Sequence, residues 1–349
     1  MAAVADAMIF PPCTDASRLG LGGAPLGNLF TAIDDAQAQL LVQTAWESGC
    51  RTFDTAPHYG NGLSEHRIGQ ALRAMPRPEF VLSTKVGRLL RPDANAARDQ
   101  NSYVQVLPFT QRWDYSAGGV QRSIEDSLQR LGMATVDVAY IHDCDATVHG
   151  ANYPQVLRQV LDEALPQLRH MQQQGLVGHI GLGVNDVQVC LDVLAQADLD
   201  CLMLAGRYTL VDHSALEDLL PLCARRGVRI ALGGVFNSGI LATGVNAAAG
   251  APALFNYAAA PPAWVARVGA VEALCTKHAV PLRAAALQFP LAHPAVEIVM
   301  LGAQHVGHWH DACHHIRQPI PAAFWAELQA LGLVPDTAAI PPAQPAPRL

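Results

Sequence analysis

The chain has 349 residues and half of them are hydrophobic, which is enough for one large core or two ordinary domains. Its formal net charge is −7 and no run of like charges occurs, so we expect neither nucleic acid nor a membrane surface as a partner. The eight cysteines are scattered without a C-x-x-C motif, and the N-terminus lacks the basic segment of a signal peptide. We therefore expect a cytoplasmic protein with reduced thiols. No apolar run reaches the roughly 20 residues that span a bilayer.

Short apolar segments alternate with longer helical ones along the whole chain. Strands are predicted to begin at Arg18, Thr52, Phe80, Val136, Val177, Asp200, Val228 and Val296. Helices are predicted over 34–48, 64–75, 119–132, 153–174, 186–196, 214–225, 263–278 and 282–292, and a further helix from near His308. Glycines that stop helices, such as Gly49, Gly132 and Gly175, mark several of these ends.

This pattern amounts to about eight βα units in one continuous run, which predicts parallel strands. The main competitor is a doubly wound sheet, whose dinucleotide site usually carries G-x-G-x-x-G, a spacing that LGLGGAPLG (19–27) lacks. We therefore predict the α/β class and a single (β/α)8 TIM barrel over residues 18–335, with long loops at its C-terminal face. Residues 1–17 are expected to be an N-terminal extension, and 336–349 a mobile, Pro-rich tail.

Polar side chains stand at the ends of three consecutive predicted strands. Asp54 follows the second strand, Tyr59 lies in the next loop, Lys85 ends the third strand and His142 ends the fourth. Because catalytic side chains of a barrel sit at the C-terminal ends of its strands, these four can converge at one mouth. Taken singly, each also fits an ordinary structural role: a turn cap, a solvated strand end or a core histidine.

The four residue types together suit proton transfer. A lysine seldom ends an apolar strand unless it is paired, and Asp54 is the natural partner of Lys85. An ammonium near Tyr59 would stabilise the phenolate and pull the pKa of Tyr59 down from about 10, which makes the phenol a usable acid or base. His142 would act as a neutral hydrogen-bond donor to a carbonyl or hydroxyl oxygen.

This pattern resembles the aldo-keto reductase superfamily, which uses an Asp, Tyr, Lys, His tetrad on a (β/α)8 barrel. The matching residues are Asp54, Tyr59, Lys85 and His142, in order, and the resemblance covers roughly residues 18–333. Further stretches are similar to the branch of NAD(P)-dependent aldose 1-dehydrogenases, such as L-fucose and D-threo-aldose dehydrogenases. They are RLGLGGAPLGNLF, STKVGRLL, IGLGVND, LAGRYTL, NSGILATG and AALQFPLAHPAV.

The resemblance implies a nicotinamide cofactor across the barrel mouth, without a Rossmann motif and without a catalytic metal. It implies that Asn185 holds the carboxamide, that Tyr208 stacks on the nicotinamide ring, and that the turn 236–241 offers backbone N–H groups and Ser238 to the pyrophosphate. This chain has Val184 and Ala205 where the family often has a serine and a glutamine. The expected cofactor contacts are Gly23, Ala24, Asp54, Asn185, Tyr208, Asn237, Ser238, Gly239, Leu241, Gly302, Gln304 and His308.

The loop after the last strand, LGAQHVGHWHDA from Leu301, contains no Arg or Lys. Since NADP-preferring relatives place a cation there for the 2′-phosphate, we expect NAD as the cofactor, with NADP possible if a histidine is protonated. The same region holds a cluster of residues that can bind zinc, but its spacings do not match a usual structural site, so no metal is expected. The cluster comprises His305, His308, His310, Cys313, His314 and His315.

The expected function is NAD(P)-dependent oxidation of a sugar of the L-fucose, L-galactose or D-arabinose type at C1. Tyr59, His142, Trp113 and His149 are expected to contact the substrate, and Asp114, Asn152 and Asn256 are further candidates for its hydroxyl groups. Two alternatives remain open: a pyridoxal 4-dehydrogenase or general aldehyde reductase on the same fold, and a cofactor-binding regulatory subunit or sensor. We expect a monomer or a homodimer whose only ligands are small molecules.

Overall fold

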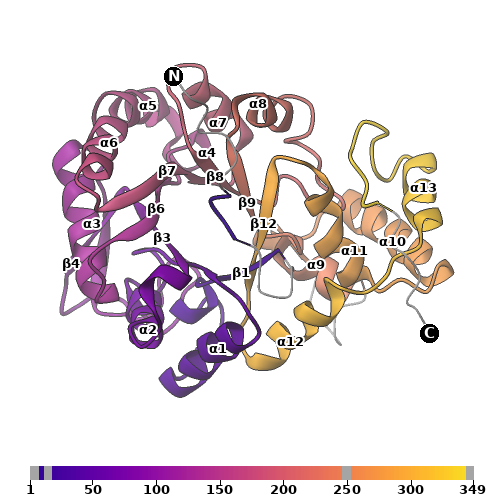
Figure 1. Cartoon of the computed structure of the whole chain (residues 1–349), viewed down its shortest axis with the longest axis horizontal. Helices are drawn as coiled ribbons and strands as arrows, with labels where there is room; N and C mark the ends of the chain where they lie inside the picture. Colours follow the sequence, from indigo (N-terminus) through magenta and orange to yellow (C-terminus); the bar gives the residue numbers. More distant parts are fainter. Residues whose placement is uncertain (1–7, 12–17, 246–252, 343–349) are drawn as a thin grey trace.

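The computed structural model describes residues 8–11, 18–245 and 253–342. Eight parallel strands close into a barrel in the order β1-β12-β9-β8-β7-β6-β3-β2. Figure 1 shows these strands at the centre with the helices arranged around them. The barrel strands are β1 (Leu19–Gly22), β2 (Thr52–Asp54), β3 (Val81–Val86), β6 (Val136–His142), β7 (Val177–Val184), β8 (Cys201–Ala205), β9 (Arg229–Gly233) and β12 (Val296–Gly302). The prediction of a single (β/α)8 barrel is confirmed.

The outer layer follows the predicted order of helices, with several shifted ends. Its α-helices are α1 (Asp35–Glu47), α2 (Leu63–Leu72), α3 (Ala117–Leu131), α4 (Ala146–His149), α5 (Tyr153–Gln159), α6 (Leu165–Gln173), α7 (Val187–Leu194), α8 (Leu219–Arg226), α9 (Ile240–Thr243), α10 (Pro262–Lys277), α11 (Leu282–Gln288), α12 (Val306–His315) and α13 (Ala322–Ala330). A π-helical turn, Val160–Ala164, joins α5 to α6. The helix predicted from residue 214 begins only at Leu219, and α13 was not predicted.

Local sequence signals explain where the helices begin and end. Asp34 accepts the Gln37 N–H at 2.7 Å while the Gln37 side chain accepts the Asp34 N–H at 3.2 Å, so a capping box starts α1. Ser116 caps α3, and Gly132 ends it in the left-handed region at φ 65°. These caps fix the connections between each strand and the following helix.

Two short hairpins project from the barrel and were not predicted. One pairs β4 (Arg88–Pro92) with β5 (Phe109–Trp113) inside the long loop after β3. The other pairs β10 (Leu254–Phe255) with β11 (Ala258–Ala259) in the loop after β9. Both belong to βα loops, so both lie on the side of the barrel where the candidate site is expected.

The N-terminal segment at residues 8–11 closes the interior of the barrel. Phe10 is 1% exposed and packs with Val138, Cys201 and Ile298 in a cluster inside the strands. The N–H groups of Ile9 and Phe10 both lie 3.2 Å from Glu297 Oε2 on β12. This part of the predicted extension therefore contacts the barrel directly, whereas the second half of the predicted tail, from residue 343, lies outside the described residues.

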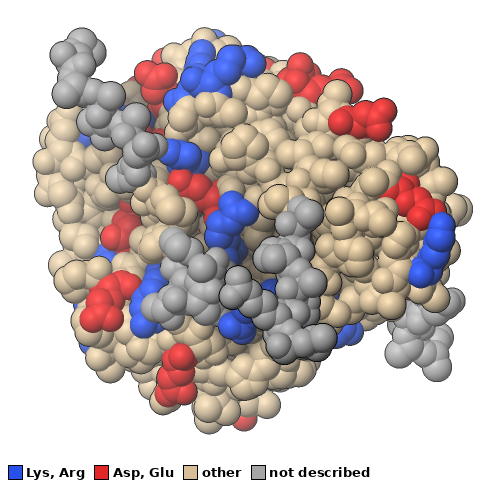
Figure 2. Space-filling model, turned by 45° about the vertical axis from the view of Figure 1, so that its right-hand side comes forward, with Lys and Arg blue, Asp and Glu red and all other residues tan. Residues whose placement is uncertain are grey.

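Charged side chains of both signs are interspersed over the face of the molecule in Figure 2. None of the helices in the described ranges is long and apolar enough to cross a bilayer.

Candidate active site

Asp54 and Lys85 form a buried ion pair at the carboxyl ends of β2 and β3. Lys85 Nζ lies 2.6 Å from Asp54 Oδ2 and also donates to the Thr55 carbonyl at 3.0 Å. Ser83 donates to the other carboxylate oxygen, Oδ1, at 2.7 Å. The side chains of Lys85 and Asp54 are 2% and 3% exposed, respectively. Because Gly183 on β7 has no side chain, the stem of Lys85 can cross the barrel interior; a Cβ there would lie 3.3 Å from Lys85 Cε.

Tyr59 and His142 lie around this pair, so the structure brings the four tetrad residues together. The ammonium of Lys85 is 4.6 Å from the centroid of the Tyr59 ring. The rings of Tyr59 and His142 are 6.1 Å apart and nearly perpendicular, and Tyr103 stacks on the other side of Tyr59 at 6.0 Å. The arrangement places a phenol, an ammonium and an imidazole at one mouth of the barrel.

The predicted direction of the pKa shift of Tyr59 is wrong for this structure. Burial of the phenol raises the pKa of Tyr59 well above 10, and the nearby carboxylate of Asp54 raises it further. The positive charge of Lys85 is largely balanced by Asp54, so it does not offset the loss of water around the phenol. Tyr59 is therefore a neutral phenol in the protein alone, ready to act as an acid.

His142 is held as a neutral imidazole, as predicted. Burial lowers the pKa of His142 well below its usual range, and the charges of Arg88 and Lys85 lower it further. Its Nε2 lies 3.5 Å from the carboxylate of Asp143, which itself pairs with Arg88. A neutral imidazole can donate one hydrogen bond to a substrate oxygen without adding charge to the site.

A cavity of about 460 Å³ opens beside Tyr59 and runs across the ends of β1, β8, β9 and β12. Among its lining residues are Gly22, Gly23, Gly206, Gly233, Gly234, Gly239 and Gly302. A Cβ at Gly206 would have no neighbour closer than 3.6 Å, and one at Gly239 none within 4 Å, so these glycines border open space. A wide, glycine-lined cavity of this size fits an extended dinucleotide such as NAD or NADP.

Ten of the twelve expected cofactor residues line this cavity; the exceptions are Tyr208 and Leu241. Tyr208 is fully buried and packs against Phe289 and His293, with ring centroids 5.2 and 5.8 Å away. It is therefore not placed to stack on a ligand in the cavity. Leu241 is also fully buried.

The turn at 236–241 offers fewer backbone donors than expected. The N–H of Asn237 donates to Gly234, and those of Gly239 and Leu241 both donate to the carbonyl of Phe236. The Ser238 hydroxyl accepts the N–H of Tyr257 at 2.8 Å and keeps its own hydrogen for a ligand. Ser238 is therefore the better candidate for a pyrophosphate contact.

Residues at the tip of the β10–β11 hairpin lie next to Asn185. The sequence alone did not indicate this proximity. The side chain of Asn185 acts on the Tyr257 hydroxyl and partly opposes the rise in the pKa of Tyr257 that burial causes. Arg207 donates to the Asn185 carbonyl at 2.6 Å and to the Asn256 side chain at 3.1 Å. The resemblance led us to expect a serine and a glutamine at positions 184 and 205, where this chain has Val184 and Ala205. The contacts from Arg207 and the hairpin tip give Asn185 polar neighbours that these two apolar side chains do not provide.

Two exposed aromatic rings border the mouth of the cavity. Phe30 is 47% and Tyr257 is 56% exposed, and their centroids are 6.4 Å apart. Both residues have left-handed backbone, at φ 61° and 64°, which is unusual for bulky side chains and is typical of functional positions.

Gln304 and His308 also line the cavity, and the Gln304 amide lies 3.5 Å from the carbonyl of Leu29. Burial lowers the pKa of His308, and the neighbouring charges of His305 and Arg283 lower it further, so His308 carries little positive charge at neutral pH. The guanidinium of Arg283 is itself paired with Asp311 at 2.8 Å.

Trp113 and His149, which were expected to contact the substrate, pack mainly against other protein groups. Trp113 lies under the guanidinium of Arg88, with the guanidinium carbon 3.9 Å from the ring centroid, and stacks on Tyr115. His149 contacts the Tyr115 hydroxyl at 3.0 Å and the edge of Trp113. Of the further candidates, Asn256 lines the cavity, whereas Asp114 binds the backbone and hydroxyl of Ser116.

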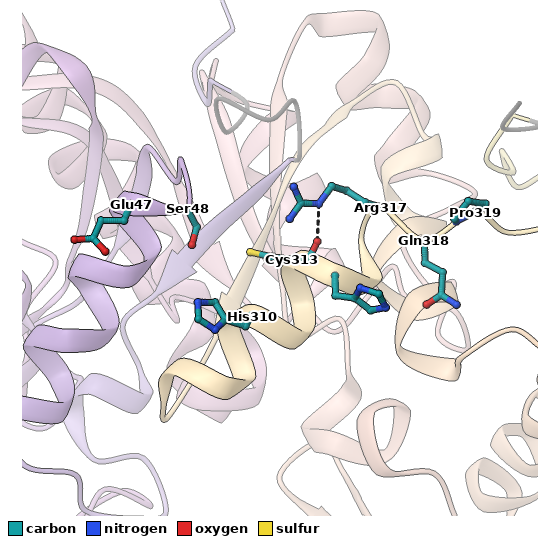
Figure 3. Close-up of a pocket in the computed structure, with 8 residues that line it drawn as sticks. Glu47, Ser48, His310, Cys313, Arg317, Gln318 and Pro319 are labelled. Atoms are coloured by element: carbon teal, nitrogen blue, oxygen red, sulfur yellow. Dashed lines mark hydrogen bonds between the residues drawn. The ribbon is translucent and has the colours of Figure 1, made fainter. Parts of the chain in front are cut away.

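The histidine cluster is split between two places. His308 lines the cavity, whereas His310, Cys313 and His314 lie on α12 in an open groove that faces Glu47 and Ser48 at the end of α1 (Figure 3). Within residues 8–11, 18–245 and 253–342, no group of three or more His, Cys, Asp or Glu side chains is arranged to hold a metal ion.

Comparison with known proteins agrees with this geometry. Residues 18–332 match the aldo/keto reductase family. The chain is 40% identical to a pyridoxal 4-dehydrogenase from Microbacterium luteolum and 38% identical to a D-threo-aldose 1-dehydrogenase from a Pseudomonas species. Each alignment covers 91% of this chain and 94% of the relative. An L-galactose dehydrogenase from Arabidopsis thaliana is 28% identical, with 92% and 88% covered.

Solved structures share the fold at lower identity. A glycerol dehydrogenase from Gluconobacter oxydans superposes with a TM-score of 0.70 at 22% identity, covering 95% of each chain. An aldo-keto reductase from Bacillus halodurans gives 0.69 at 23% identity, covering 90% of this chain and 92% of that one. With the tetrad assembled at the mouth of the barrel and the family model matched along most of the sequence, the chain belongs to the aldo/keto reductase family and is an NAD(P)-dependent oxidoreductase.

Proposed function

We propose that this enzyme oxidises a cyclic aldose of the L-fucose, L-galactose or D-arabinose type at C1, giving the lactone. The observation that carries the proposal is the position of Tyr59, which lines the glycine-rich cavity and lies against the buried Asp54–Lys85 pair. A relative that covers nearly the same residues is named for D-threo-aldose oxidation at C1, which supports this substrate class.

The roles of the side chains follow from their contacts. Tyr59 first loses its own proton to solvent, and the resulting phenolate takes the proton of the anomeric hydroxyl while His142 donates a hydrogen bond to the same oxygen. Bound NAD or NADP supplies the acceptor for the hydride that leaves C1. Lys85, fixed by Asp54, keeps a positive charge against the Tyr59 ring and stabilises the phenolate that must be present before oxidation begins. Because the pKa of Tyr59 starts high, we expect oxidation to be faster at alkaline pH.

We further propose that NAD is preferred over NADP. The part of the cavity near Gln304 and His308 lacks an Arg or Lys in the loop after β12, and the pKa of His308 is lowered. Arg283, the cation that acts on His308, is already paired with Asp311. A 2′-phosphate would therefore find only a weak positive partner.

Pyridoxal is the second candidate substrate. A relative of 40% identity is named pyridoxal 4-dehydrogenase, and its alignment covers as much of this chain as the aldose enzyme does. The stacked rings of Tyr59 and Tyr103 would also suit a flat aromatic ligand. Pyridoxal forms a cyclic hemiacetal, so Tyr59 would remove a proton from the same kind of hydroxyl group.

Steady-state absorbance of reduced nicotinamide separates these substrates. The wild type and Tyr59→Phe are assayed with NAD or NADP against L-fucose, L-galactose, D-arabinose, D-glucose and pyridoxal. Rapid turnover of a sugar with NAD supports the proposal, whereas activity with pyridoxal alone would move the assignment to the second candidate. Slow, stoichiometric conversion of cofactor with every substrate would instead favour a sensor.

A further inference from the structure

The guanidinium of Arg88 joins several elements beside the catalytic residues. Arg88 begins β4, the first strand of the unpredicted β4–β5 hairpin, and its side chain is 10% exposed. Its Nη1 lies 2.8 Å from Nδ1 of His58 and 3.1 Å from Oε1 of Gln111. Its Nη2 pairs with the carboxylate of Asp143, and the group lies flat over Trp113. One cation therefore contacts the residue before Tyr59 and the residue after His142.

These contacts determine which nitrogen of His58 carries hydrogen. A guanidinium has only donors, so the 2.8 Å contact with Arg88 favours a lone pair on Nδ1 of His58 and the ring hydrogen on Nε2, whereas the Gln111 oxygen would favour the opposite tautomer. Gln111 is oriented by its own partners, since its amide nitrogen donates to Asn61 at 2.7 Å and its oxygen accepts from Arg88. In the Nε2–H tautomer the Gln111 amide oxygen and Nδ1 of His58, which lie 2.9 Å apart, both accept from Arg88 Nη1.

His58 stands close to the catalytic groups. Its ring centroid lies 6.1 Å from Tyr59, 5.7 Å from His142 and 5.2 Å from Tyr103. The cations that act on it are Arg88 from β4 and Lys85 from β3. Burial and these charges lower the pKa of His58 to about 3, so the ring is neutral at any working pH.

Arg88 also compensates the charge of a carboxylate that contacts His142. Asp143 Oδ2 lies 3.5 Å from His142 Nε2, a distance at which a free carboxylate would favour the imidazolium. Because Asp143 is paired with Arg88, its negative charge is compensated. The other titratable or charged groups that act on or contact His142 are Arg88, Lys85, His58 and the phenol of Tyr59.

We propose that Arg88 is a positioning residue that fixes the tautomer of His58 and, together with burial, keeps His58 and His142 as two neutral imidazoles next to Tyr59. The proposal rests on the proposed function in one respect: oxidation requires the site to hold an oxidised nicotinamide, which is positively charged. Two protonated histidines would repel that charge in a poorly hydrated site, whereas two neutral ones add no charge to the Asp54–Lys85 and Arg88–Asp143 pairs.

Nitrogen NMR of the histidine rings tests the tautomer without any substrate. The full-length chain is labelled at its 14 histidines, and His58→Gln and His142→Gln assign the two signals. In the wild type, His58 should show hydrogen on Nε2 and stay neutral from pH 8 to pH 5. In Arg88→Met, the pKa of His142 should rise because Asp143 loses its compensating cation, and the ring hydrogen of His58 should be able to move to Nδ1, which faces Gln111. Burial should keep the pKa of each ring lowered, and Arg88→Lys should restore the wild-type spectrum only in part, because an ammonium keeps the charge but loses the fork.

Arg77→Met is the matched control. Its guanidinium also lies over an aromatic ring, 4.8 Å from the centroid of Phe80, and also pairs with an aspartate, Asp137, at 2.7 Å. This change should leave both active-site histidines neutral. If Arg88→Met does not fold, the wild-type spectrum still decides, because an Nδ1–H tautomer or an ordinary titration of His58 would overturn the proposal.

The pH profile of catalysis gives the second readout. For any substrate that the wild type turns over, Arg88→Met should lose more of its kcat at pH 5.5 than at pH 9, because the raised pKa of His142 lets this ring become protonated at the lower pH. An equal loss at both pH values would mean a merely structural role and would contradict the proposal. Absence of wild-type turnover with every sugar would count against the proposed function and leave the NMR result standing.

Discussion

Replacing Lys85 by methionine shows how much unfolding free energy is lost when the buried Asp54–Lys85 ion pair beside Tyr59 is broken. The change keeps a similar volume but leaves the Asp54 carboxylate, which now lies 2.6 Å from the ammonium, without its cation. Both side chains are at most 3% exposed, so water cannot replace the lost partner. Breaking such a pair costs about 3–5 kcal/mol in unfolding free energy.

The loss should depend on pH in a defined direction. Burial already raises the pKa of Asp54, and removal of Lys85 removes the charge that opposes this rise. The lone carboxyl can then bind a proton as the pH falls, which relieves the penalty. Lys85→Met should therefore be less destabilising at pH 5 than at pH 8, and Lys85→Met with Asp54→Asn should recover most of the stability without recovering activity.

Urea unfolding at pH 5 and pH 8 measures these differences. Lys277→Met serves as the control, because Lys277 pairs with Glu327 on the surface, where its side chain is 63% exposed, and should change stability little. The reasoning would be refuted if Lys85→Met were as stable as the wild type at pH 8, or if the double variant were as unstable as the single one.

Four further predictions concern catalysis and cofactor binding. Tyr59→Phe should bind cofactor normally and lose roughly 10²–10⁴-fold in kcat, checked by cofactor titration and steady-state rates. In the wild type, oxidation should accelerate with rising pH while reduction should not, because the raised pKa of Tyr59 favours the acid form; equal profiles would contradict this assignment. Tyr257→Phe should weaken cofactor binding about 2–10-fold because Asn185 loses the neighbouring hydroxyl, whereas Tyr153→Phe, whose hydroxyl bonds Asp192 outside the cavity, should not. Gln304→Arg should improve NADP binding by about tenfold and Gln304→Glu should weaken it, measured as the NADP to NAD ratio of kcat/KM.

The barrel and the convergence of the tetrad were predictable because they follow from regular patterns. Apolar strands alternate with helices along the chain, and polar residues stand where three of the strands end. Since parallel strands in a barrel share one carboxyl edge, Asp54, Lys85 and His142 had to meet there once the fold was known.

The features that escaped prediction depend on contacts between distant residues. The β4 and β5 strands, Arg88–Pro92 and Phe109–Trp113, are short and polar and are separated by residues 93–108, so neither has a clear period of two. The position of Tyr208 depends on which way its loop turns after β8, and nothing local distinguishes a ring that faces the cavity from one that faces the core.

The sign of the pKa shift of Tyr59 was not accessible from the sequence for a related reason. The order of residues suggested a lysine beside the phenol, but not how completely Asp54 would compensate it or how little water would reach the ring. A balance between desolvation and nearby charge can be judged only from the three-dimensional arrangement.

Transfer of deuterium from C1 of the substrate tests the central claim most directly. The enzyme is incubated with L-fucose, L-galactose or D-arabinose carrying deuterium at C1, with NAD, and the reduced cofactor and the sugar product are analysed by mass spectrometry. We predict that the reduced nicotinamide gains one deuterium, that a lactone appears in equal amount, and that Tyr59→Phe nearly abolishes both. Reduced cofactor without deuterium, or no reduced cofactor with any of the three sugars, would contradict the account.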